Sequence, residues 1–334
     1  MSAKSSMAVL VTGGAGYIGS HAVLALLDAG WRVVVIDNLV TGFRWAVPGA
    51  ATLIEGDIAD GPLVESIIAE HGIGAIMHFA GSVVVPESVS NPLKYYHNNT
   101  ANSRSLLESA VKGGVKHFIF SSTAATYGIP DSVPVAEDAP KRPINPYGMS
   151  KLMTEAMLAD VAAAHPINYC ALRYFNVAGA DPAGRSGQST AGATHLIKIA
   201  VEAASGKRGH VSVFGTDYAT PDGTGVRDYI HVGDLADAHL HALDALIAEP
   251  GVSRTLNCGY GRGFSVLEVL DAVDRVANVK LERRMEPRRA GDPDALIADN
   301  KAILSSLPWR PKYDDLDRIV TDALNWERQL GLRG

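Results

Sequence analysis

Along the chain, short apolar runs alternate with longer segments in which apolar residues recur at helical spacing. Residues 8–11 form an apolar run typical of a buried parallel strand, and residues 21–27 repeat apolar positions at helical spacing before Gly30. A second run over 32–36 ends at Asp37. Further strands are predicted at 51–55, 75–79, 116–120, 168–174 and 255–258. The clearest remaining helices are predicted at 92–113, 147–165 and 316–330.

This alternation predicts an α/β protein with a Rossmann-type doubly wound parallel sheet and a smaller C-terminal α/β substrate-binding lobe. We expect residues 1–175 to form the first domain, with 230–260 returning to it. Residues 176–229 and 261–334 are expected to form the lobe. Long segments rich in Gly, Pro, Asp and Thr are predicted to be functional loops, at 178–192, 214–225 and 287–293.

A glycine-rich turn separates the first predicted strand from the first helix. Gly13, Gly16 and Gly19 allow a tight turn and bring a pyrophosphate close to the N–H groups of the helix start. Asp37 lies at the end of the next strand, about 20 residues further on, where an acid binds an adenosine ribose. A ligand-free turn is the alternative, and the strand, helix and acid in register argue against it. The acid's charge would repel a 2′-phosphate, which favours NAD over NADP.

A second motif is the pair Tyr147 and Lys151, preceded by the run from Phe120 to Thr123. Residues four apart lie on the same helix face, so we expect the ammonium to lower the phenol's pKa. Tyr147 would then act as an acid–base group on an alcohol or sugar hydroxyl. Alone, this spacing also describes two ordinary surface residues. The glycine turn is the independent feature that favours the catalytic interpretation.

Composition narrows the function class. The chain has 334 residues, is 47% hydrophobic and 20% charged, and carries a formal net charge of −6. It shows no basic patch suited to nucleic acid and no 18-residue apolar run, so neither nucleic acid nor a membrane is expected as a partner. The histidines lack metal-ligand spacing, so no metal is expected. Residues 1–6 are polar and unlike a signal peptide. Cys170 and Cys258 are predicted core thiols, which suggests a cytoplasmic location.

Two loop arginines are candidate phosphate ligands. Arg227 and Arg289 are surrounded by Gly and Asp, and a guanidinium fork matches phosphate oxygens. A solvated surface charge is the alternative for each. Asp292, close to Arg289 in the sequence, is placed to accept ribose hydroxyls.

The chain resembles the UDP-glucose 4-epimerases (UDP-galactose 4-epimerases), a family of extended short-chain dehydrogenases/reductases, nearly from end to end. Most specific is the stretch 222–232, DGTGVRDYIHV. The other segments that carry the resemblance are 12–21 (TGGAGYIGSH), 37–39, 55–58, 79–81, 87–88, 95–96, 98–99, 147–151 and 173–176.

The resemblance implies reversible inversion at C4 of a UDP-hexose through a 4-keto sugar, with NAD kept bound, in galactose metabolism. Tyr147 would deprotonate the 4′-hydroxyl, Lys151 would hold the nicotinamide ribose, and Thr123 would hydrogen-bond near the 4′-oxygen. Besides Tyr147 and Lys151, the implied cofactor residues are Gly13, Gly16, Tyr17, Ile18, Gly19, Asp37, Asn38, Asp57, Ile58, Phe79, Ala80, Gly81, Asn98 and Phe175. Besides Thr123, the implied substrate residues are Asn176, His195, Leu196, Phe214, Arg227, Arg289, Asp292 and Leu296.

The chain departs from the family pattern at four places. Thr123 replaces a frequent Ser and keeps the hydroxyl, and His195 stands where an Asn often contacts the diphosphate. Residues 82–86 read Ser-Val-Val-Val-Pro where many members carry a Lys near the cofactor, which predicts looser NAD binding. Leu296 aligns with a tyrosine that fills space beside the sugar C2 substituent, which predicts some turnover of UDP-GlcNAc and UDP-GalNAc.

Other functions fit the sequence less well. A 4,6-dehydratase needs Asp-Glu after the threonine, whereas Ala124-Ala125 follow Thr123. A 4-epimerase of UDP-xylose/UDP-arabinose or of UDP-glucuronate stays open. A regulator that had lost catalysis would have no reason to keep Thr123, Tyr147 and Lys151 together, and a scaffold role is weaker still.

We also expect a homodimer, formed by pairing of two helices across a two-fold axis. The small and apolar residues at helical spacing on the two candidate helices are Leu106, Leu107, Ala110 and Val111 on one and Leu152, Ala156, Leu158 and Ala159 on the other.

Overall fold

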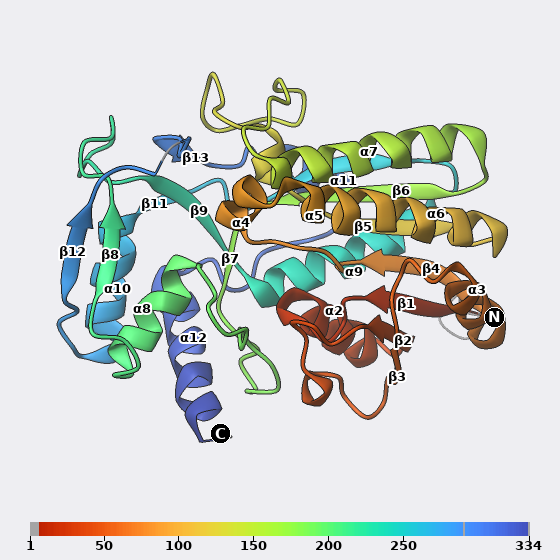
Figure 1. Ribbon diagram of the computed structural model, residues 1–334, viewed down its shortest axis with the longest axis horizontal. Helices are drawn as coiled ribbons and strands as arrows, with labels where there is room; N and C mark the ends of the chain where they lie inside the picture. Colours follow the sequence, from red (N-terminus) through yellow and green to blue (C-terminus); the bar gives the residue numbers. More distant parts are fainter. Residues whose placement is uncertain (1–6, 290, 333–334) are drawn as a thin grey trace.

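A parallel sheet of seven strands, in the order β10-β6-β5-β4-β1-β2-β3, forms the centre of the molecule in the computed structural model (Figure 1). The structure describes residues 7–289 and 291–332; the polar stretch 1–6, which the sequence analysis distinguishes from a signal peptide, lies outside them. The strands are β1 (Ala8–Thr12), β2 (Arg32–Asp37), β3 (Thr52–Glu55), β4 (Ile73–His78), β5 (His117–Thr123), β6 (Asn168–Tyr174) and β10 (Arg254–Cys258). This topology confirms the predicted doubly wound α/β fold.

The two faces of the sheet carry separate hydrophobic cores because successive strand residues point to opposite sides. Val9 and Val11 of β1 belong to one core, together with residues of α2 (Tyr17–Asp28) and α9 (Val232–Ala248). Ala8 and Leu10 belong to the other, together with residues of α3 (Gly61–His71), α6 (Asn102–Lys112) and α7 (Pro146–Ala164). Figure 1 shows α7 and α6 on one side of the sheet and α2 on the other.

The helices that flank the sheet, and the short turns beside them, follow the strands in the order expected of a doubly wound fold. They are α2 (Tyr17–Asp28), η1 (Arg44–Ala46), α3 (Gly61–His71), α4 (Val85–Ser90), α5 (Pro92–Tyr95), η2 (Tyr96–Ala101), α6 (Asn102–Lys112), η3 (Ala124–Thr126), α7 (Pro146–Ala164) and α9 (Val232–Ala248). No helix among the described residues is long and apolar enough to span a bilayer.

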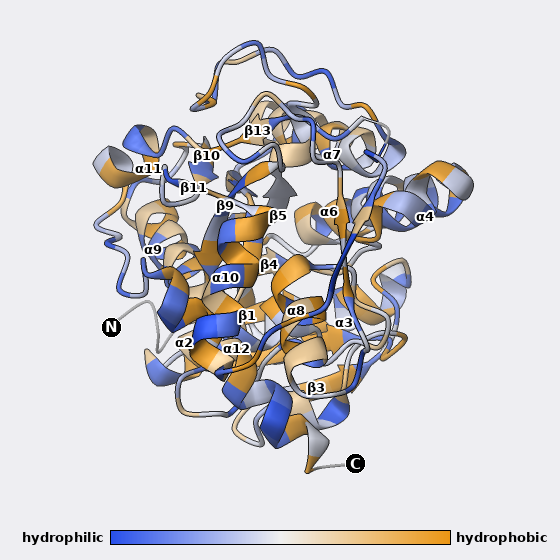
Figure 2. Cartoon of the chain, turned by 90° about the vertical axis from the view of Figure 1, so that its left-hand side faces the viewer, coloured by the Kyte–Doolittle hydropathy of each residue, from blue (hydrophilic) through white to orange (hydrophobic). Residues whose placement is uncertain are grey.

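A smaller group of strands and helices continues from the carboxyl end of β6. β9 pairs with β7, β11 and β13, and β8 pairs with β12. Figure 2 shows apolar residues concentrated on one side of α10 and α12, as packing against these strands requires. The elements are β7 (Asn176–Ala178), α8 (Leu196–Ala204), β8 (Val211–Phe214), β9 (Val226–His231), β11 (Gly263–Ser265), α10 (Val266–Ala277), β12 (Arg283–Glu286), β13 (Ala295–Leu296), α11 (Lys301–Ser306) and α12 (Leu316–Gly331).

The predicted helix at 92–113 differs from the structure in one respect. It begins as α5, passes through the π-helical turn η2 over Tyr96–Ala101, and continues as α6. A π turn inserts extra backbone into a helix and often marks a functional site. Here it contains Asn98 and Asn99, so the irregularity lies at a predicted cofactor residue.

Candidate active site

The glycine turn after β1 leaves no room for side chains. A Cβ atom at Gly13, whose φ is +70°, would lie 2.6 Å from the Ala80 backbone nitrogen, and one at Gly19 would lie 2.2 Å from the Gly13 oxygen. Gly16 is the N-cap of α2, and no side chain caps this helix start. The first N–H groups of α2 therefore face the turn without an intrahelical partner, as an anion site requires.

Asp37, at the carboxyl end of β2, is tied to the same turn. Its buried carboxylate accepts hydrogen bonds from the backbone nitrogens of Ala15, at 2.9 Å, and Leu39, at 2.8 Å. A Cβ at Gly42 would lie 2.9 Å from the Asp37 Oδ1 atom, so the following loop also closes on the carboxylate. An uncapped helix start, a glycine cradle and an acid beside it fit the pyrophosphate and ribose of NAD.

The remaining predicted cofactor residues follow the carboxyl edge of the sheet. Asp57 and Ile58 come directly after β3, at one end, and Phe79 to Gly81 follow β4. Since strands are spaced about 4.8 Å apart, the path from β3 to β5 spans roughly 19 Å, suited to an extended dinucleotide. The sheet therefore brings together residues that the sequence scatters over more than a hundred positions.

The π turn η2 packs on the segment after Gly81. Asn98 Nδ2 donates to Ser82 Oγ at 3.0 Å, and Asn99 Oδ1 accepts from the Ser82 nitrogen at 2.7 Å. Asn99 Nδ2 also donates to Ser150 Oγ, at 3.0 Å, on α7. The asparagines thus fix the loop that departs from the family pattern against the helix that carries Tyr147.

Thr123, Tyr147 and Lys151 meet where β5 ends under the first turns of α7. Asn145 caps this helix by accepting from the Gly148 nitrogen at 2.9 Å, and a Cβ at Gly148 would lie 2.5 Å from the Ala125 oxygen. The beginning of α7 is therefore pressed against the chain that leaves β5. All three side chains are buried, with 7, 8 and 3% of their surface exposed in that order.

The ionisation of this group differs from the prediction. Burial raises the pKa of Tyr147, and the hydrogen bond with Thr123 opposes that shift. Burial also lowers the pKa of Lys151, to about 8. The expectation that Lys151 lowers the Tyr147 pKa is wrong for this structure because desolvation dominates. The Lys151 ammonium instead donates to the Ser121 carbonyl at 2.9 Å and faces the Phe120 ring at 5.0 Å.

Predicted substrate residues gather on the lobe. Arg227 Nη2 lies 3.5 Å from Asp292 Oδ1, and Leu296 is the register partner of Arg227 between β13 and β9. The Arg289 guanidinium lies 3.9 Å from the centre of the Phe214 ring, which it covers. Leu296 also packs with Phe175 in a small buried cluster at the boundary with the sheet. Two predicted arginines, an acid and an aromatic ring are thus held on adjoining elements.

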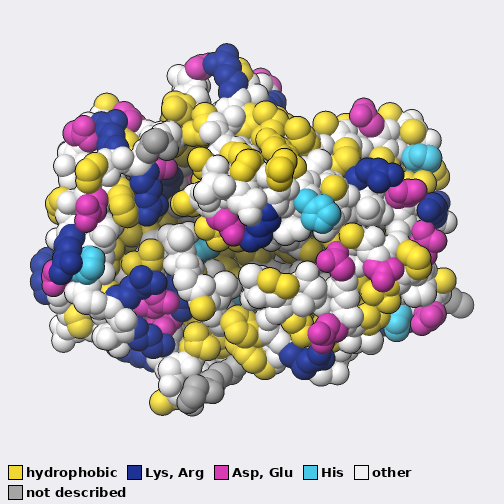
Figure 3. Space-filling view, viewed as in Figure 1, with side chains coloured by type: hydrophobic (Ala, Val, Ile, Leu, Met, Phe, Trp, Pro, Cys, Tyr) yellow, Lys and Arg dark blue, Asp and Glu magenta, His cyan; other side chains and the backbone are white. Residues whose placement is uncertain are grey.

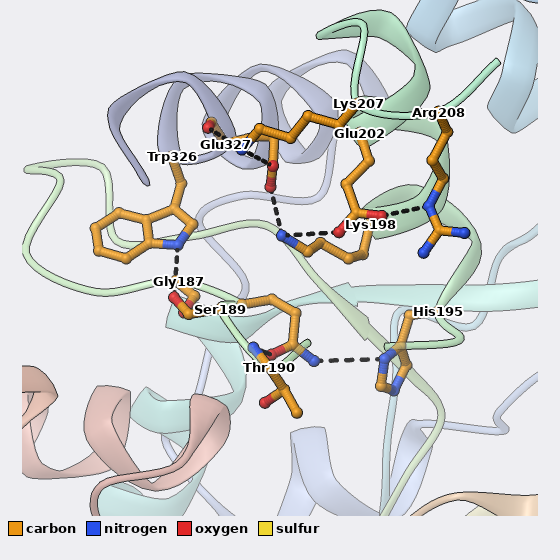
Figure 4. A network of polar contacts seen from close by, with 11 residues as sticks. Gly187, Ser189, Thr190, His195, Lys198, Glu202, Lys207, Arg208, Trp326 and Glu327 are labelled. Carbon is orange, nitrogen blue, oxygen red and sulfur yellow. Dashed lines mark hydrogen bonds and ion pairs between the residues drawn. The ribbon is translucent and has the colours of Figure 1, made fainter. Parts of the chain in front are cut away.

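A narrow cavity, partly open to solvent, joins predicted cofactor and substrate residues. Tyr17 lines it opposite Asn176, His195 and Leu196, and the Tyr17 hydroxyl donates to the Gly179 oxygen at 2.7 Å. Figure 4 shows His195 below Lys198, and both residues line the cavity.

An ionic cluster around Lys198 is a part of the site that the sequence reasoning missed. The buried ammonium of Lys198 pairs with the buried Glu327 carboxylate of α12 and lies 3.4 Å from Glu202 (Figure 4). Lys207 contacts the other Glu327 oxygen at 2.6 Å. Lys198 and Glu327 are 129 positions apart, so nothing local in the sequence reveals the pair. Trp326, whose indole nitrogen donates to Ser189, also lines the cavity and was likewise missed.

Comparison with known proteins agrees with this geometry. Residues 9–259 match the NAD dependent epimerase/dehydratase family. The chain is 56% identical to the UDP-glucose 4-epimerase of Azospirillum brasilense, over 98% of this chain and 93% of that protein. It is 48% identical to that of Streptococcus mutans, over 96% of both.

Solved structures are similar as well. A UDP-glucose 4-epimerase from Stenotrophomonas, with bound NAD and formylated UDP-arabinopyranose, has a TM-score of 0.95 and 40% identity, covering 98% of this chain and 100% of that one. The Brucella ovis enzyme in complex with NAD has a TM-score of 0.93 and 44% identity, covering 96% and 98%. With a family match over most of its length and relatives of this identity, the chain belongs to the NAD dependent epimerase/dehydratase family.

Proposed function

We propose that this protein is a UDP-glucose 4-epimerase, which interconverts UDP-glucose and UDP-galactose through a 4-keto sugar with bound NAD. The observation that carries the proposal is the meeting of Thr123, Tyr147 and Lys151 at the end of β5, beside a glycine turn that fits NAD. Close relatives named UDP-glucose 4-epimerase cover nearly the whole chain. Solved relatives with bound UDP-sugars support a UDP-hexose as the substrate.

In the proposed mechanism, Tyr147 moves one proton in each direction. Its phenolate accepts the 4′-hydroxyl proton while the C4 hydrogen leaves as hydride, and the phenol returns the proton when hydride reaches the opposite face of C4. When bound, NAD supplies the acceptor and donor of that hydride. Proton and hydride both return to the sugar, so the cycle consumes neither.

The side chains around Tyr147 set its protonation and its position. Thr123 stabilises the phenolate by hydrogen bonding, which opposes the rise in the Tyr147 pKa that burial causes. Lys151, when protonated, adds a positive charge to the same pocket and holds the nicotinamide ribose. Burial of all three keeps water from the ketone, which would otherwise add to it or carry protons away.

We extend the proposal to the other predicted residues. Gly13, Gly16 and Gly19 hold the pyrophosphate of NAD with Tyr17 and Ile18, and Asp37 binds its adenosine ribose. The segments that complete the NAD site come from several strand ends, and their residues are Asn38, Asp57, Ile58, Phe79, Ala80, Gly81, Asn98 and Phe175. The UDP-sugar is bound by Asn176, His195, Leu196, Phe214, Arg227, Arg289, Asp292 and Leu296, from the lobe formed by 176–229 and 261–334. Among the described residues, 7–175 and 230–260 form the NAD domain.

The decisive experiment measures conversion of UDP-galactose by the purified protein with no added cofactor. Tyr147→Phe should lower kcat roughly 10²- to 10⁴-fold, the usual contribution of a general acid–base group, and leave the NAD content unchanged. Tyr169→Phe, a half-buried tyrosine at the far end of β6, is the matched control and should keep full activity. A Tyr147→Phe protein within tenfold of the parent would refute the mechanism. If the parent does not convert UDP-galactose but converts a UDP-pentose or UDP-glucuronate, the substrate is that sugar nucleotide instead.

We also propose a homodimer, with a contact face that keeps only the exposed part of the predicted one, which includes Ala156 and Ala159 of α7. Leu106, Leu107, Ala110 and Leu158 face the core and are unavailable for pairing. Met153 of α7 is 41% exposed, and it lines an apolar surface groove with Tyr96, Ala101 and Met157. Leu93 of α5 is 77% exposed. Figure 3 shows further hydrophobic side chains gathered around α4 and the beginning of α7. These surfaces support pairing through α5–α7.

A cytoplasmic location completes the proposal. Cys170 and Cys258 are both free thiols buried in strands of the main sheet, which suits a reducing compartment. Fractionation of cells that express the tagged protein tests this directly, and recovery outside the cytoplasmic fraction would contradict it.

A further inference from the structure

Consecutive residues at the end of β5 contact successive turns of α7. The Ser121 carbonyl accepts from the Lys151 ammonium at 2.9 Å, and the Ser122 hydroxyl donates to a Glu155 carboxylate oxygen. Glu155 follows Lys151 by one helical turn, as Lys151 follows Tyr147. A third polar residue, buried like the first two, therefore continues the line of the catalytic pair along the helix.

Glu155 is held from the other side by a buried arginine of β6. Arg173 Nε donates to Glu155 Oε1 at 2.9 Å, and Nη2 donates to Oε2 at 2.6 Å, so the two side chains form a bidentate pair. Only 8% of Glu155 and 5% of Arg173 are exposed. Arg173 is the register partner of Ser122 between β6 and β5, which places both contacts of Glu155 at one level of the sheet.

The pair extends into a network through the Nη1 group of Arg173. Arg173 Nη1 donates to the Tyr127 hydroxyl at 2.9 Å and to the Glu137 carbonyl at 3.1 Å. The Tyr127 hydroxyl donates in turn to Asn257 Oδ1, at 2.7 Å, on β10. A buried network of several hydrogen bonds is rigid, because moving one member breaks more than one bond in a region of low dielectric constant.

From this geometry, we propose that Glu155 and Arg173 form a positioning pair for the reaction. The pair fixes the rotation of α7 over β5 and β6, and thereby holds the Tyr147 phenol and the Lys151 ammonium at the reacting carbon. Neither residue contacts substrate or cofactor in this proposal. The inference rests on the proposed function, since it concerns the residues assigned to that chemistry.

Two physical arguments favour positioning over simple stabilisation. A buried ion pair seldom adds net stability over well-packed apolar residues, because desolvation offsets the attraction. A tyrosine hydroxyl lies roughly 9 Å from its helix axis, so a rotation of α7 by about 7° moves the hydroxyl by about 1 Å. A displacement of that size can lower a reaction rate about 10²-fold. Two parallel hydrogen bonds to one carboxylate oppose such a rotation directly.

The test uses the full-length holoenzyme and the Glu155→Gln variant, which keeps the side chain's shape and loses its charge. We expect kcat per folded, NAD-loaded protein to fall about 10- to 100-fold, with KM for UDP-galactose and NAD content within about 3-fold of the parent. Ser122→Ala keeps the ion pair and removes one hydrogen bond, so it should fold and lose about 2- to 5-fold in kcat. If Glu155→Gln does not fold, Ser122→Ala carries the test.

Asp234→Asn is the matched control for loss of a buried carboxylate. Asp234 is fully buried on α9 and accepts from the Tyr260 hydroxyl at 2.5 Å and from the backbone nitrogens of Lys312 and Tyr313, both at 2.9 Å. It belongs to neither the catalytic nor the binding residues. Its replacement should lower the melting temperature and leave kcat per folded protein unchanged. Equal kcat losses in Asp234→Asn and Glu155→Gln would overturn the positioning role.

A second readout separates this inference from the proposed function. The ultraviolet titration of the Tyr147 phenol, obtained as the difference between each protein and its Tyr147→Phe derivative, needs no turnover. Displacement of Tyr147 from Thr123 should shift the midpoint in Glu155→Gln by more than about half a pH unit. If the midpoint and kcat of Glu155→Gln both equal those of the parent, the positioning role is overturned. The proposed function is unaffected by that result, because the parent is active. If the parent has no activity on any UDP-sugar, the function fails and the titration alone decides the positioning role.

Discussion

Replacing Lys151 by methionine should remove activity and make the protein more stable at neutral pH. The Lys151 side chain is 3% exposed, and its ammonium has one hydrogen bond, to the Ser121 carbonyl at 2.9 Å. Burial lowers its pKa from 10.5 to about 8. The folded protein therefore holds this charge at a free-energy cost that methionine, of similar length and without charge, does not carry.

The size and the sign of the effect follow from that pKa. One pH unit corresponds to about 1.36 kcal/mol, so the fall from 10.5 to about 8 is a cost on the order of 3 kcal/mol. The unfolded chain keeps its proton up to pH 10.5, whereas the folded protein releases it near 8. The cost is therefore complete below about pH 8 and disappears as the pH approaches 10.5. Loss of the hydrogen bond to Ser121 offsets about 1–2 kcal/mol, leaving Lys151→Met about 1–2 kcal/mol more stable at pH 7.

Urea unfolding of parent and variant between pH 7 and pH 10 measures this difference. Both proteins must first be freed of nucleotide, because NAD held by only one of them would shift the comparison. The stability difference should move by about 2 kcal/mol or more toward the parent across the range, so that the parent is the more stable protein near pH 10. Lys116→Met, at an exposed position just before β5, is the control and should show no such trend. A stability difference that stays constant from pH 7 to pH 10 would refute the argument from burial.

Three further predictions test other parts of the site. Gly19→Ala places a Cβ 2.2 Å from the Gly13 oxygen. Overpacking of about 1–3 kcal/mol should weaken NAD binding, measured by calorimetry, roughly 5- to 150-fold. Gly49→Ala, where a Cβ has nothing within 4 Å, should leave NAD binding unchanged. Leu296→Tyr should lower the ratio of UDP-GlcNAc to UDP-galactose turnover about tenfold or more. If the parent does not convert UDP-GlcNAc at all, the prediction of a wider pocket is wrong. Met153→Glu should convert a dimer to a monomer in light scattering, and an unchanged mass would place the contact elsewhere.

Local patterns were sufficient for the central sheet and the glycine turn. The apolar run 8–11 became β1 because both faces of a parallel sheet are covered, and the buried strand then reads as continuous apolar residues. The glycines and Asp37 were predictable since they act within one strand–helix–strand unit, where sequence spacing translates directly into position. The spacing of Tyr147 and Lys151 likewise placed both on one face of α7. Their roles in NAD binding and proton transfer stay predictions.

Other features could not be predicted from the sequence because they result from the packing of distant segments. The π turn at Tyr96–Ala101 has no local signature in the sequence. Its Asn99 forms hydrogen bonds with Ser82 and with Ser150 on α7, which come together with it only in the folded chain. The direction of the Tyr147 pKa was mispredicted because helical spacing indicates a nearby lysine but not how much water is excluded from both groups.

The sequence by itself determined the order of strands and helices, the glycine turn with its acid, and which residues are able to carry the chemistry. These follow from backbone preferences and from periodicity over a few turns or one strand. Only the tertiary structure decided that Arg173 of β6 pairs with Glu155 of α7, and that Glu327 of the last helix pairs with Lys198 beside the cavity. Such pairs depend on burial and on register between segments far apart in the chain. Burial and register are defined only once these segments have packed together.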